Sequence, residues 1–393
     1  MERVIFHVDV NSAFLSWEAA RRVADGESDL RLVPSAVGGD PNSRVSIISA
    51  KSIPAKKYGI TTGEPVSLAL RKCPELVVVP PDFKLYRKCS ADFIAICRTY
   101  TPLLEQFSID ECFLDMTGME LIYPDIVATA YDLKNRIREE LGFTVNVGVG
   151  SNKLLAKMAS DFEKPDKVHT LFYNEIAAKM WPLPIGDLFL AGKSATQKLM
   201  GAHIRTIGDL AAQDEKYIKN LLGEKSGALL YSYAHGIDDS ELSQEREDAK
   251  SYSMSTTLEE NVVTKERAYD ILRMLSETVS HKMRQDGAYA GCVSVTIRSD
   301  EFVNKSHQRM LYNPTNISSE VFSTAKMLFD EMWDEKTPLR LLNVGLSNIT
   351  KEEYEQLSLF TDEAKEKSRK VDKLMDTLSD KYGKNVVKRG IRN

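Results

Sequence analysis

The chain has 393 residues, of which 42% are hydrophobic and 28% are charged, and this composition excludes a disordered or fibrous protein. At roughly 100–200 residues per domain, the length predicts two to four domains. The formal net charge of -5, from 52 basic and 57 acidic residues, disfavours a protein that coats nucleic acid non-specifically, so any DNA-binding surface must have its positive charge segregated.

The five cysteines are odd in number and contain no C-x-x-C pair, which predicts neither a disulfide framework nor a zinc knuckle and favours a reducing cytoplasm. The first residues lack the charge pattern of a signal peptide, and no apolar run approaches the roughly 20 residues of a membrane span. The sequence therefore predicts a cytoplasmic protein with no membrane role.

In the first part of the chain, strands and helices are expected to alternate. A short apolar run over residues 3–8 suits a buried strand, which places Asp9 just past its end, and Asn11 or Ser12 can cap the next helix. After a break at Pro80 and Pro81, the pattern predicts a helix over 83–100, strands over 104–108 and 112–115, a helix over 126–141, a strand over 144–149 and a helix from about 152. This alternation indicates an α/β sheet domain.

Two further units follow. Residues 172–236 show short helices broken by glycines and no convincing strand, which predicts a small helical domain. A charged stretch over 238–250 has no periodicity and is typical of a linker. A second α/β unit is then expected, with strands over 252–258, 290–298, 301–310 and 339–346 and helices over 266–284 and 318–333, before a charged, partly helical tail.

Two adjacent carboxylates, Asp110 and Glu111, stand in an otherwise apolar predicted hairpin. Neighbours on a regular strand point to opposite faces, so both can reach one site only at a strand end or a bulge, where Asp9 could join them. Crowded carboxylates repel one another, and Mg²⁺ takes oxygen ligands while leaving positions for phosphates, which is the layout of two-metal phosphoryl transfer. A turn with exposed acids is the alternative.

Three motifs carry a resemblance to a known family: HVDVNSAF at 7–14, SIDE at 108–111 and GVGSNK at 148–153. Their order and spacing resemble the Y-family DNA polymerases, closest to the DNA polymerase IV class. This resemblance implies a multidomain α/β and α fold of the right-hand polymerase type. Its parts would be a ferredoxin-like palm at 1–22 and 80–168, small fingers at 23–79, a helical thumb at 169–240, a linker at 241–250, an α/β little finger at 251–349 and a tail at 350–393.

The implied activity is low-fidelity translesion synthesis on primer-template DNA, with dNTPs as substrates and no proofreading domain. In the implied metal site, Asp9 and Asp110 bridge two Mg²⁺ ions, Glu111 holds the ion at the primer 3′-hydroxyl, and the Val10 carbonyl is a neutral ligand; Mn²⁺ is a possible substitute. Phe14 is the implied steric gate, whose ring occupies the space that a ribose 2′-hydroxyl would need.

Nucleotide binding is assigned by the same resemblance to the positions of Ile53, Lys56 and Lys164, with Lys57 a weaker candidate. Many members carry a tyrosine and an arginine where this chain has Ile53 and Lys56. Isoleucine cannot donate a hydrogen bond, and lysine lacks the bidentate fork of arginine. Asn11 replaces an aspartate of many relatives, which is not the usual metal ligand.

DNA contacts are expected at two places. In the thumb, a turn that resembles a helix-hairpin-helix would offer backbone N–H groups to a phosphate, with a plain helix connection as the alternative. In the second α/β unit, strand cations are candidates for backbone contacts, with solvated edge charges as the alternative. The thumb residues are Gly192, Lys193 and Ser194, and the strand residues are Arg298, Lys305, His307 and Arg309.

The tail contains a pentapeptide that resembles the bacterial sliding-clamp-binding motif, with Gln356 and the apolar anchors Leu357, Leu359 and Phe360. Exposed apolar residues in a tail suggest a partner, and clamp tethering would raise the effective concentration at the primer end. A short helix packed on the little finger is the alternative. The protein is expected to be a monomer.

Two other functions are weighed against the polymerase. A nucleotidyl cyclase can share a palm-like sheet with paired carboxylates but needs neither a thumb nor a clamp motif. A catalytically degenerate member could act as a DNA-binding or scaffolding subunit, in keeping with Ile53 and Lys56. The intact carboxylates argue against this second reading.

Overall fold

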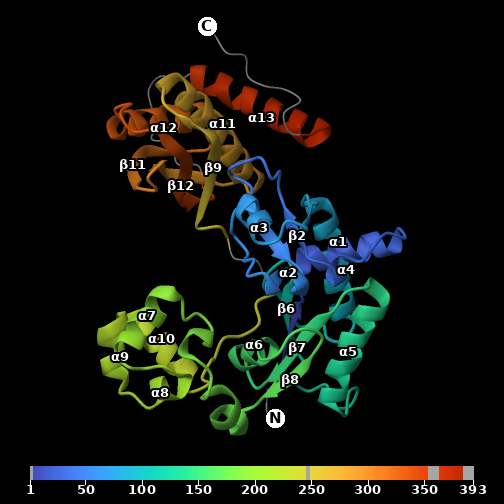
Figure 1. Ribbon diagram of the computed structural model, residues 1–393. Helices are drawn as coiled ribbons and strands as arrows, with labels where there is room; N and C mark the ends of the chain where they lie inside the picture. The colour runs from blue at the N-terminus through green and yellow to red at the C-terminus, as the bar shows by residue number, and fades with distance from the viewer. Residues whose placement is uncertain (1–2, 245–247, 353–362, 384–393) are drawn as a thin grey trace. The chain divides into compact units, whose positions relative to one another are not determined.

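The computed structural model describes residues 3–244, 248–352 and 363–383 (Figure 1). The chain divides into two compact units, Met1–Arg246 and Glu247–Asn393. None of the helices within the described ranges combines the length and the hydropathy that a membrane span requires.

A five-stranded sheet forms the centre of the first unit, in the order β5-β6-β1-β7-β8. Its central strand β1 runs antiparallel to both neighbours. The strands are β1 (Ile5–Val10), β5 (Leu104–Gln106), β6 (Glu111–Asp115), β7 (Val145–Gly150) and β8 (Val168–Leu171).

One prediction about this sheet is wrong, and one of its strands was not predicted. Asp9 lies within β1 and not past its end, because it still pairs with Glu111 on one side and Asn146 on the other. The edge strand β8 was not predicted, and it extends the sheet to Leu171 by pairing parallel to β7.

The two faces of β1 pack against different helices, because side chains alternate along a strand. Phe6, Val8 and Val10 belong to the main core, around the fully buried Trp17. Helices on that side are α1 (Ala13–Ala24), α4 (Phe83–Arg98) and α5 (Ile126–Leu141). Ile5 packs on the opposite side with Phe113 and with Ala156 of α6 (Lys153–Asp161). His7 and Asp9 therefore face α6.

Two glycines let α6 approach the sheet closely. A Cβ on Gly148 would lie 2.0 Å from the carbonyl oxygen of Ala156, and one on Gly150 would lie 2.7 Å from the Ala156 nitrogen. Any larger residue would push the helix away. The glycines of the GVGSNK motif thus bring the side chains of α6 onto the face that carries Asp9.

A smaller three-stranded sheet, in the order β3-β2-β4, has its own core around Ile48, Ile60 and Val66. The Ser52 hydroxyl accepts a hydrogen bond from the Ala55 N–H at 3.1 Å and so caps the short helix that follows β3. The elements are η1 (Leu30–Leu32), β2 (Ser35–Gly38), β3 (Ile48–Lys51), α2 (Ile53–Lys57), α3 (Val66–Lys72) and β4 (Val77–Val79).

The helical region after β8 packs around Leu199, Ile207 and Leu230, in agreement with the predicted small helical domain. Its elements are η2 (Tyr173–Glu175), η3 (Ile176–Met180), η4 (Ile185–Asp187), α7 (Lys193–Gly201), α8 (Ile207–Ala211), α9 (Glu215–Leu222) and α10 (Glu224–Ala234).

The second unit is a four-stranded antiparallel sheet, in the order β11-β10-β12-β9, with two helices packed on one face. Its strands are β9 (Ser251–Val262), β10 (Tyr289–Ser299), β11 (Asn304–Thr315) and β12 (Leu339–Thr350), and the helices are α11 (Lys265–Gln285) and α12 (Ser318–Met332). The predicted start of β11 at residue 301 is wrong, because Phe302 adopts φ 65° and its N–H donates to the Ser299 carbonyl in the turn.

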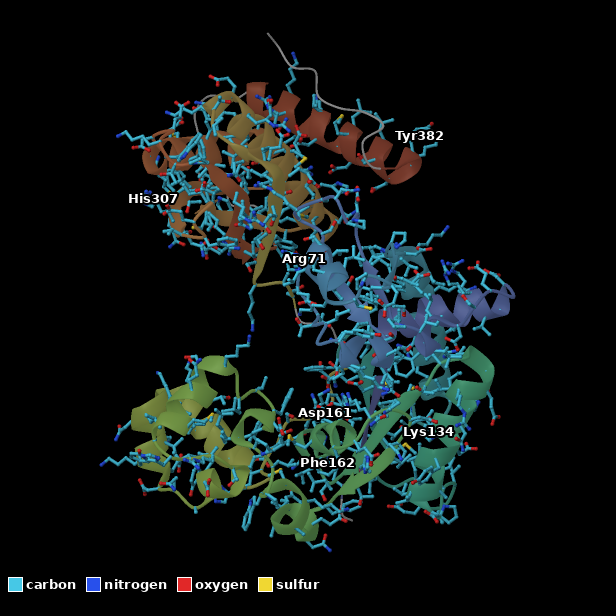
Figure 2. All side chains as sticks on the ribbon, viewed as in Figure 1. Arg71, Lys134, Asp161, Phe162, His307 and Tyr382 are labelled. Carbon is cyan, nitrogen blue, oxygen red and sulfur yellow. The ribbon has the colours of Figure 1, made fainter. Side chains whose placement is uncertain are left out.

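The tail is partly helical, as predicted, and its helix α13 (Glu363–Tyr382) is held against α11 and α12 by ionic hydrogen bonds. Arg284 lies 2.6 Å from Asp376, and the Asp376 carboxylate is also 2.8 Å from His281. Asp372 accepts a hydrogen bond from the Ser318 N–H at 2.9 Å. Tyr382 marks the end of this helix (Figure 2).

We expect Asp376→Asn to destabilise the protein near neutral pH and to destabilise it less in acid. Burial raises the pKa of Asp376, but hydrogen bonds from Arg284 and His281 outweigh burial and lower this pKa below its ordinary value of 3.8. A depressed folded-state pKa gives stability that is complete above the unfolded value and is lost as pH falls below it. Urea unfolding should therefore show a deficit of about 1–3 kcal/mol at pH 7 that shrinks at pH 3.

The exposed Asp270 on α11 offers a matched control, and Asp270→Asn should lose little at either pH. A deficit of the same size at both values of pH would show that the charge of Asp376 contributes nothing.

Candidate functional site

The three predicted carboxylates meet at one corner of the larger sheet. The register of β1 and β6 pairs Asp9 with Glu111, so their side chains emerge on the same face. β6 begins at Glu111, and Asp110 therefore precedes the strand, where the Val10 N–H donates to the Asp110 carbonyl at 2.9 Å. The expectation that two adjacent acids could share a site only at a strand end agrees with this geometry.

Two lysines bring positive charge to these acids. The Lys157 amine, from α6, lies 2.8 Å from Glu111 Oε2 and 3.3 Å from Asp9 Oδ2. Lys164 Nζ lies 3.0 Å from Asp9 Oδ1 and 2.8 Å from Asp161, which stands at the end of α6 (Figure 2). Burial lowers the pKa of Lys157, but the charges of Asp9 and Glu111 outweigh burial and raise it. Both lysines are therefore charged.

His7 fixes the position of the Glu111 carboxylate through a hydrogen bond. It is fully buried, with Nε2 3.1 Å from Glu111 Oε2 and Nδ1 2.8 Å from the Ser160 hydroxyl. Burial lowers the pKa of His7, which favours the neutral ring.

Sequence reasoning missed His7 and Lys157. A signal for His7 was available, because a residue two positions before Asp9 on a strand shares its face. Lys157 had no such signal, since it comes from a helix 148 residues further along the chain.

The surrounding protein stabilises the negative charge of Glu111 more than that of Asp110. Burial raises the pKa of Glu111, but hydrogen bonds from His7 and Lys157 lower it to about 2. Burial also raises the pKa of Asp110, and burial together with the charges of Asp9 and Glu111 outweighs the hydrogen bond from the Ser108 hydroxyl, so the pKa stays raised. Asp110 is thus the carboxylate that a cation would stabilise most.

The donor atoms suit a hard divalent cation. In the described part of the chain, His7, Asp9 and Glu111 each offer a ligand atom within 4.8 Å of the others. Asp110 is not in that closest group and faces the neighbouring cleft. Carboxylate oxygens are the ligands that Mg²⁺ and Mn²⁺ prefer. A cation at Asp9 and Glu111 would compete with Lys157 for the same oxygens.

A cleft of about 440 Å³ opens beside Asp9 and Asp110, a size typical of small-molecule sites. The cleft is lined by five further residues that were assigned to metal or nucleotide binding: Val10, Phe14, Ile53, Lys56 and Lys164. Lys51, Ser52 and Thr62 also line it and were not predicted.

Phe14 is held rigidly at the wall of this cleft. Its ring stacks on Tyr86 with centroids 4.5 Å apart and an interplanar angle of 9°, and Phe83 meets it edge-on at 6.2 Å. The Tyr86 hydroxyl donates to Glu18 at 3.0 Å, which fixes the supporting ring.

Asn11 is a structural link in the loop region beside the cleft. Its side-chain oxygen accepts hydrogen bonds from the Asp166 N–H at 2.9 Å and the Thr144 hydroxyl at 3.0 Å. Its amide donates to Asn146 at 3.1 Å. Asn11 therefore ties the segment that carries Lys164 to the sheet.

The predicted strand cations of the second unit do not share a face. Lys305, His307 and Arg309 pair directly with Ile297, Val295 and Val293, whose side chains are buried under the helices. Arg309 lies 2.6 Å from Glu331 of α12, and His307 extends from the same strand (Figure 2). Arg298 points to the opposite, open face.

In the helical region after β8, Gly192 is the N-cap of α7, and Lys193 and Ser194 are exposed in its first turn. Gln356, Leu357, Leu359 and Phe360 lie outside the described residues.

The impB/mucB/samB family matches residues 8–161, and its C-terminal domain matches residues 249–359. The DNA polymerase IV of Clostridium acetobutylicum is 44% identical over 392 residues, which cover 100% of this chain and 98% of that protein. DNA polymerase IV 1 of Bacillus subtilis is 36% identical and covers 99% of this chain and 92% of its own.

A solved Y-family DNA polymerase chimera has a TM-score of 0.76 at 20% identity, over 89% of this chain and 100% of that one, which shows a common fold. The right-hand polymerase fold is thereby confirmed. The chain belongs to the impB/mucB/samB family of Y-family DNA polymerases, in the DNA polymerase IV class.

Proposed function

We propose that the protein is a DNA-directed DNA polymerase that carries out low-fidelity translesion synthesis, transferring nucleotides from dNTPs to a primer 3′-hydroxyl. The observation that carries this proposal is the meeting of Asp9, Asp110 and Glu111 beside a cleft whose wall is Phe14. The same observation disfavours the degenerate scaffold, which would have no need of intact carboxylates.

Asp9, Asp110 and Glu111 would hold two divalent cations, Mg²⁺ in this proposal, with the Val10 carbonyl as a neutral ligand. When bound, such ions activate the attacking hydroxyl and neutralise the charge of the triphosphate. His7 orients Glu111 by its hydrogen bond, as an outer partner does for a metal-ligating carboxylate.

The remaining cleft residues would handle the nucleotide. Lys56 and Lys164 supply positive charge for the triphosphate, and Lys164 already lies next to Asp9, where the reacting phosphate would sit. Phe14 would exclude the 2′-hydroxyl of a ribonucleotide. Ile53 lines the cleft as an apolar side chain, with 53% of its surface exposed.

The open face of the second unit's sheet suits a DNA backbone. Its three central rows of side chains contain no carboxylate, and Arg298 is the one cation in these rows. The Arg298 Nε–H donates a hydrogen bond to the Asn304 side-chain oxygen at 2.8 Å. The rows are Ser253, Gly345, Ser294 and Gln308; Ser255, Asn343, Thr296 and Ser306; Thr257, Leu341, Arg298 and Asn304. Hydroxyl and amide groups can donate to phosphates without reading base sequence. The exposed first turn of α7, with Gly192, Lys193 and Ser194, would add a phosphate contact.

Primer extension tests the function. Purified full-length protein with primer-template DNA, Mg²⁺ and dNTPs should add template-directed nucleotides and continue past an abasic site in the template. A nucleotidyl cyclase would instead convert a free triphosphate without template, and a scaffold would bind DNA without extending it. Either result would overturn the proposal.

Clamp tethering remains part of the proposal and rests on Gln356, Leu357, Leu359 and Phe360. The double variant Leu359→Ala, Phe360→Ala should weaken binding to a bacterial sliding clamp by tenfold or more, because each buried anchor contributes about 1.5–3 kcal/mol. Binding to immobilised clamp measures this effect, and Glu353→Ala is the control. Equal clamp binding by the double variant would contradict the assignment.

Action as a monomer in the cytoplasm completes the proposal, and the five free cysteines are in keeping with a reducing compartment.

A further inference from the structure

Lys51 is a cation of the cleft that has no role in the function proposed above. It is the last residue of β3, and it lines the same cleft as Asp9, Asp110 and Phe14. Lys56, from the helix that follows, lines this cleft too, so the smaller sheet directs two ammonium groups at one space.

Neither lysine has an acidic partner. Lys51 donates a hydrogen bond to the neutral Thr62 hydroxyl at 3.1 Å, and within the described residues neither Lys51 nor Lys56 forms an ion pair. Glu64 is the carboxylate whose charge acts on Lys51, but Glu64 is itself paired with Lys72 at 2.6 Å. Among the described residues, the two ammonium groups therefore face the cleft with no carboxylate bonded to either of them.

This arrangement costs free energy unless an anion enters. Burial lowers the pKa of Lys51, and the charge of Lys56 lowers it further, which is the sign of a partly desolvated cation with a like charge nearby. A multiply charged anion between them would relieve both effects and would form charge-assisted hydrogen bonds.

The nature of that anion follows from the neighbours. Lys164, a third lysine in the cleft, lies 3.0 Å from Asp9, at the carboxylate site. One end of the anion would lie at the carboxylate site, beside Lys164, and the other end would lie at Lys56 and Lys51. An anion that contacts all three lysines must be extended and carry several charges, as a triphosphate does. We propose that Lys51 is a further nucleotide-binding residue, whose ammonium contacts the triphosphate of the incoming dNTP together with Lys56. This inference rests on the proposed polymerase function for the identity of the anion.

Ile53 gives this contact its importance in the present chain. Ile53 also lines the cleft, and in the sequence it stands between Lys51 and Lys56. Its side chain can donate no hydrogen bond to a phosphate. Two point charges, one on each side of Ile53, would then supply the affinity that this position cannot.

The test measures nucleotide binding separately from catalysis. Full-length protein is loaded with a primer-template whose primer ends in a dideoxynucleotide, so that no bond forms, and the Kd of the complementary dNTP is measured in Mg²⁺ from the fluorescence of 2-aminopurine in the template. We expect Lys51→Ala to raise this Kd about tenfold, as for loss of a charge-assisted hydrogen bond. The Kd of the primer-template should stay within about twofold.

Two variants control for charge and for folding. Lys51→Arg keeps the cation and should bind dNTP within about threefold of wild type, and Lys51→Met keeps the aliphatic stem and replaces the alanine variant if that one unfolds. Arg71→Ala removes an exposed cation from α3 (Figure 2), outside the cleft, and should change neither Kd.

An unchanged dNTP Kd in both Lys51→Ala and Lys51→Met would overturn the inference. So would a weaker primer-template Kd with an unchanged dNTP Kd, since Lys51 would then contact DNA. Extension of an unblocked primer by the wild type is scored separately. If the wild type binds dNTP normally but does not extend this primer, the polymerase proposal is refuted, and the test of Lys51 as a nucleotide-binding residue still stands.

Discussion

Replacing Asp110 by alanine is expected to reduce primer extension by about a thousandfold or more, because a metal-binding carboxylate supports several kcal/mol of transition-state stabilisation. Asp110 is the acid of the site whose pKa stays raised, because burial, together with the charges of Asp9 and Glu111, outweighs the hydrogen bond from the Ser108 hydroxyl. Single-turnover extension with saturating dNTP and Mg²⁺ measures the loss.

The variant should retain its affinity for primer-template DNA, because the Asp110 side chain faces the cleft and, among the described residues, its carboxylate accepts a hydrogen bond from the Ser108 hydroxyl alone, while the backbone bond to Val10 is kept. Glu139→Ala removes an exposed carboxylate of α5 and provides the control. Extension by the Asp110 variant at more than a tenth of the wild-type rate would show that this carboxylate binds no catalytic ion.

Phe14→Ala is expected to weaken discrimination against ribonucleotides by about 10–200-fold, the range for one small group in a closely fitting pocket. The wild-type ring cannot move aside, because Tyr86 stacks on it at 4.5 Å and is itself fixed by Glu18. Removal of the ring opens the space for a 2′-hydroxyl. The ratio of kcat/KM for a dNTP and the matching rNTP measures the change.

Phe83→Ala serves as the matched control, because Phe83 touches Phe14 edge-on but does not line the cleft. Its ratio should stay near that of the wild type. If the Phe14→Ala enzyme incorporates ribonucleotides no better than the wild type, Phe14 is not the steric gate.

Local pattern predicted most elements of the larger sheet, and its errors have a common cause. Asp9 was expected beyond its strand, because a carboxylate interrupts an apolar run; in the structure the ladder to Glu111 and Asn146 continues through it. β8 was missed because four residues beside a charged segment show no periodicity of their own, and pairing with β7 makes them a strand. Tertiary pairing decided both cases.

The second unit shows the same limit for surface residues. Alternation along β11 placed Lys305 and Arg309 on one face, which is correct, but no pattern within a single strand says which face the helices cover. The register with Ile297 and Val293 directs both lysine and arginine to the helix side. Arg298, in the neighbouring strand, lies on the open side.

The sequence by itself determined the family, and it predicted the metal-binding carboxylates and the steric gate, because these are carried by short motifs whose order and spacing are readable along the chain. Only the tertiary structure decided what surrounds them. His7 meets Glu111 through strand register, Lys157 reaches Asp9 because Gly148 and Gly150 admit α6, and Lys51 joins the cleft from a different sheet. Side chains that come from distant segments meet through packing and pairing, and local sequence preferences carry no information about such contacts.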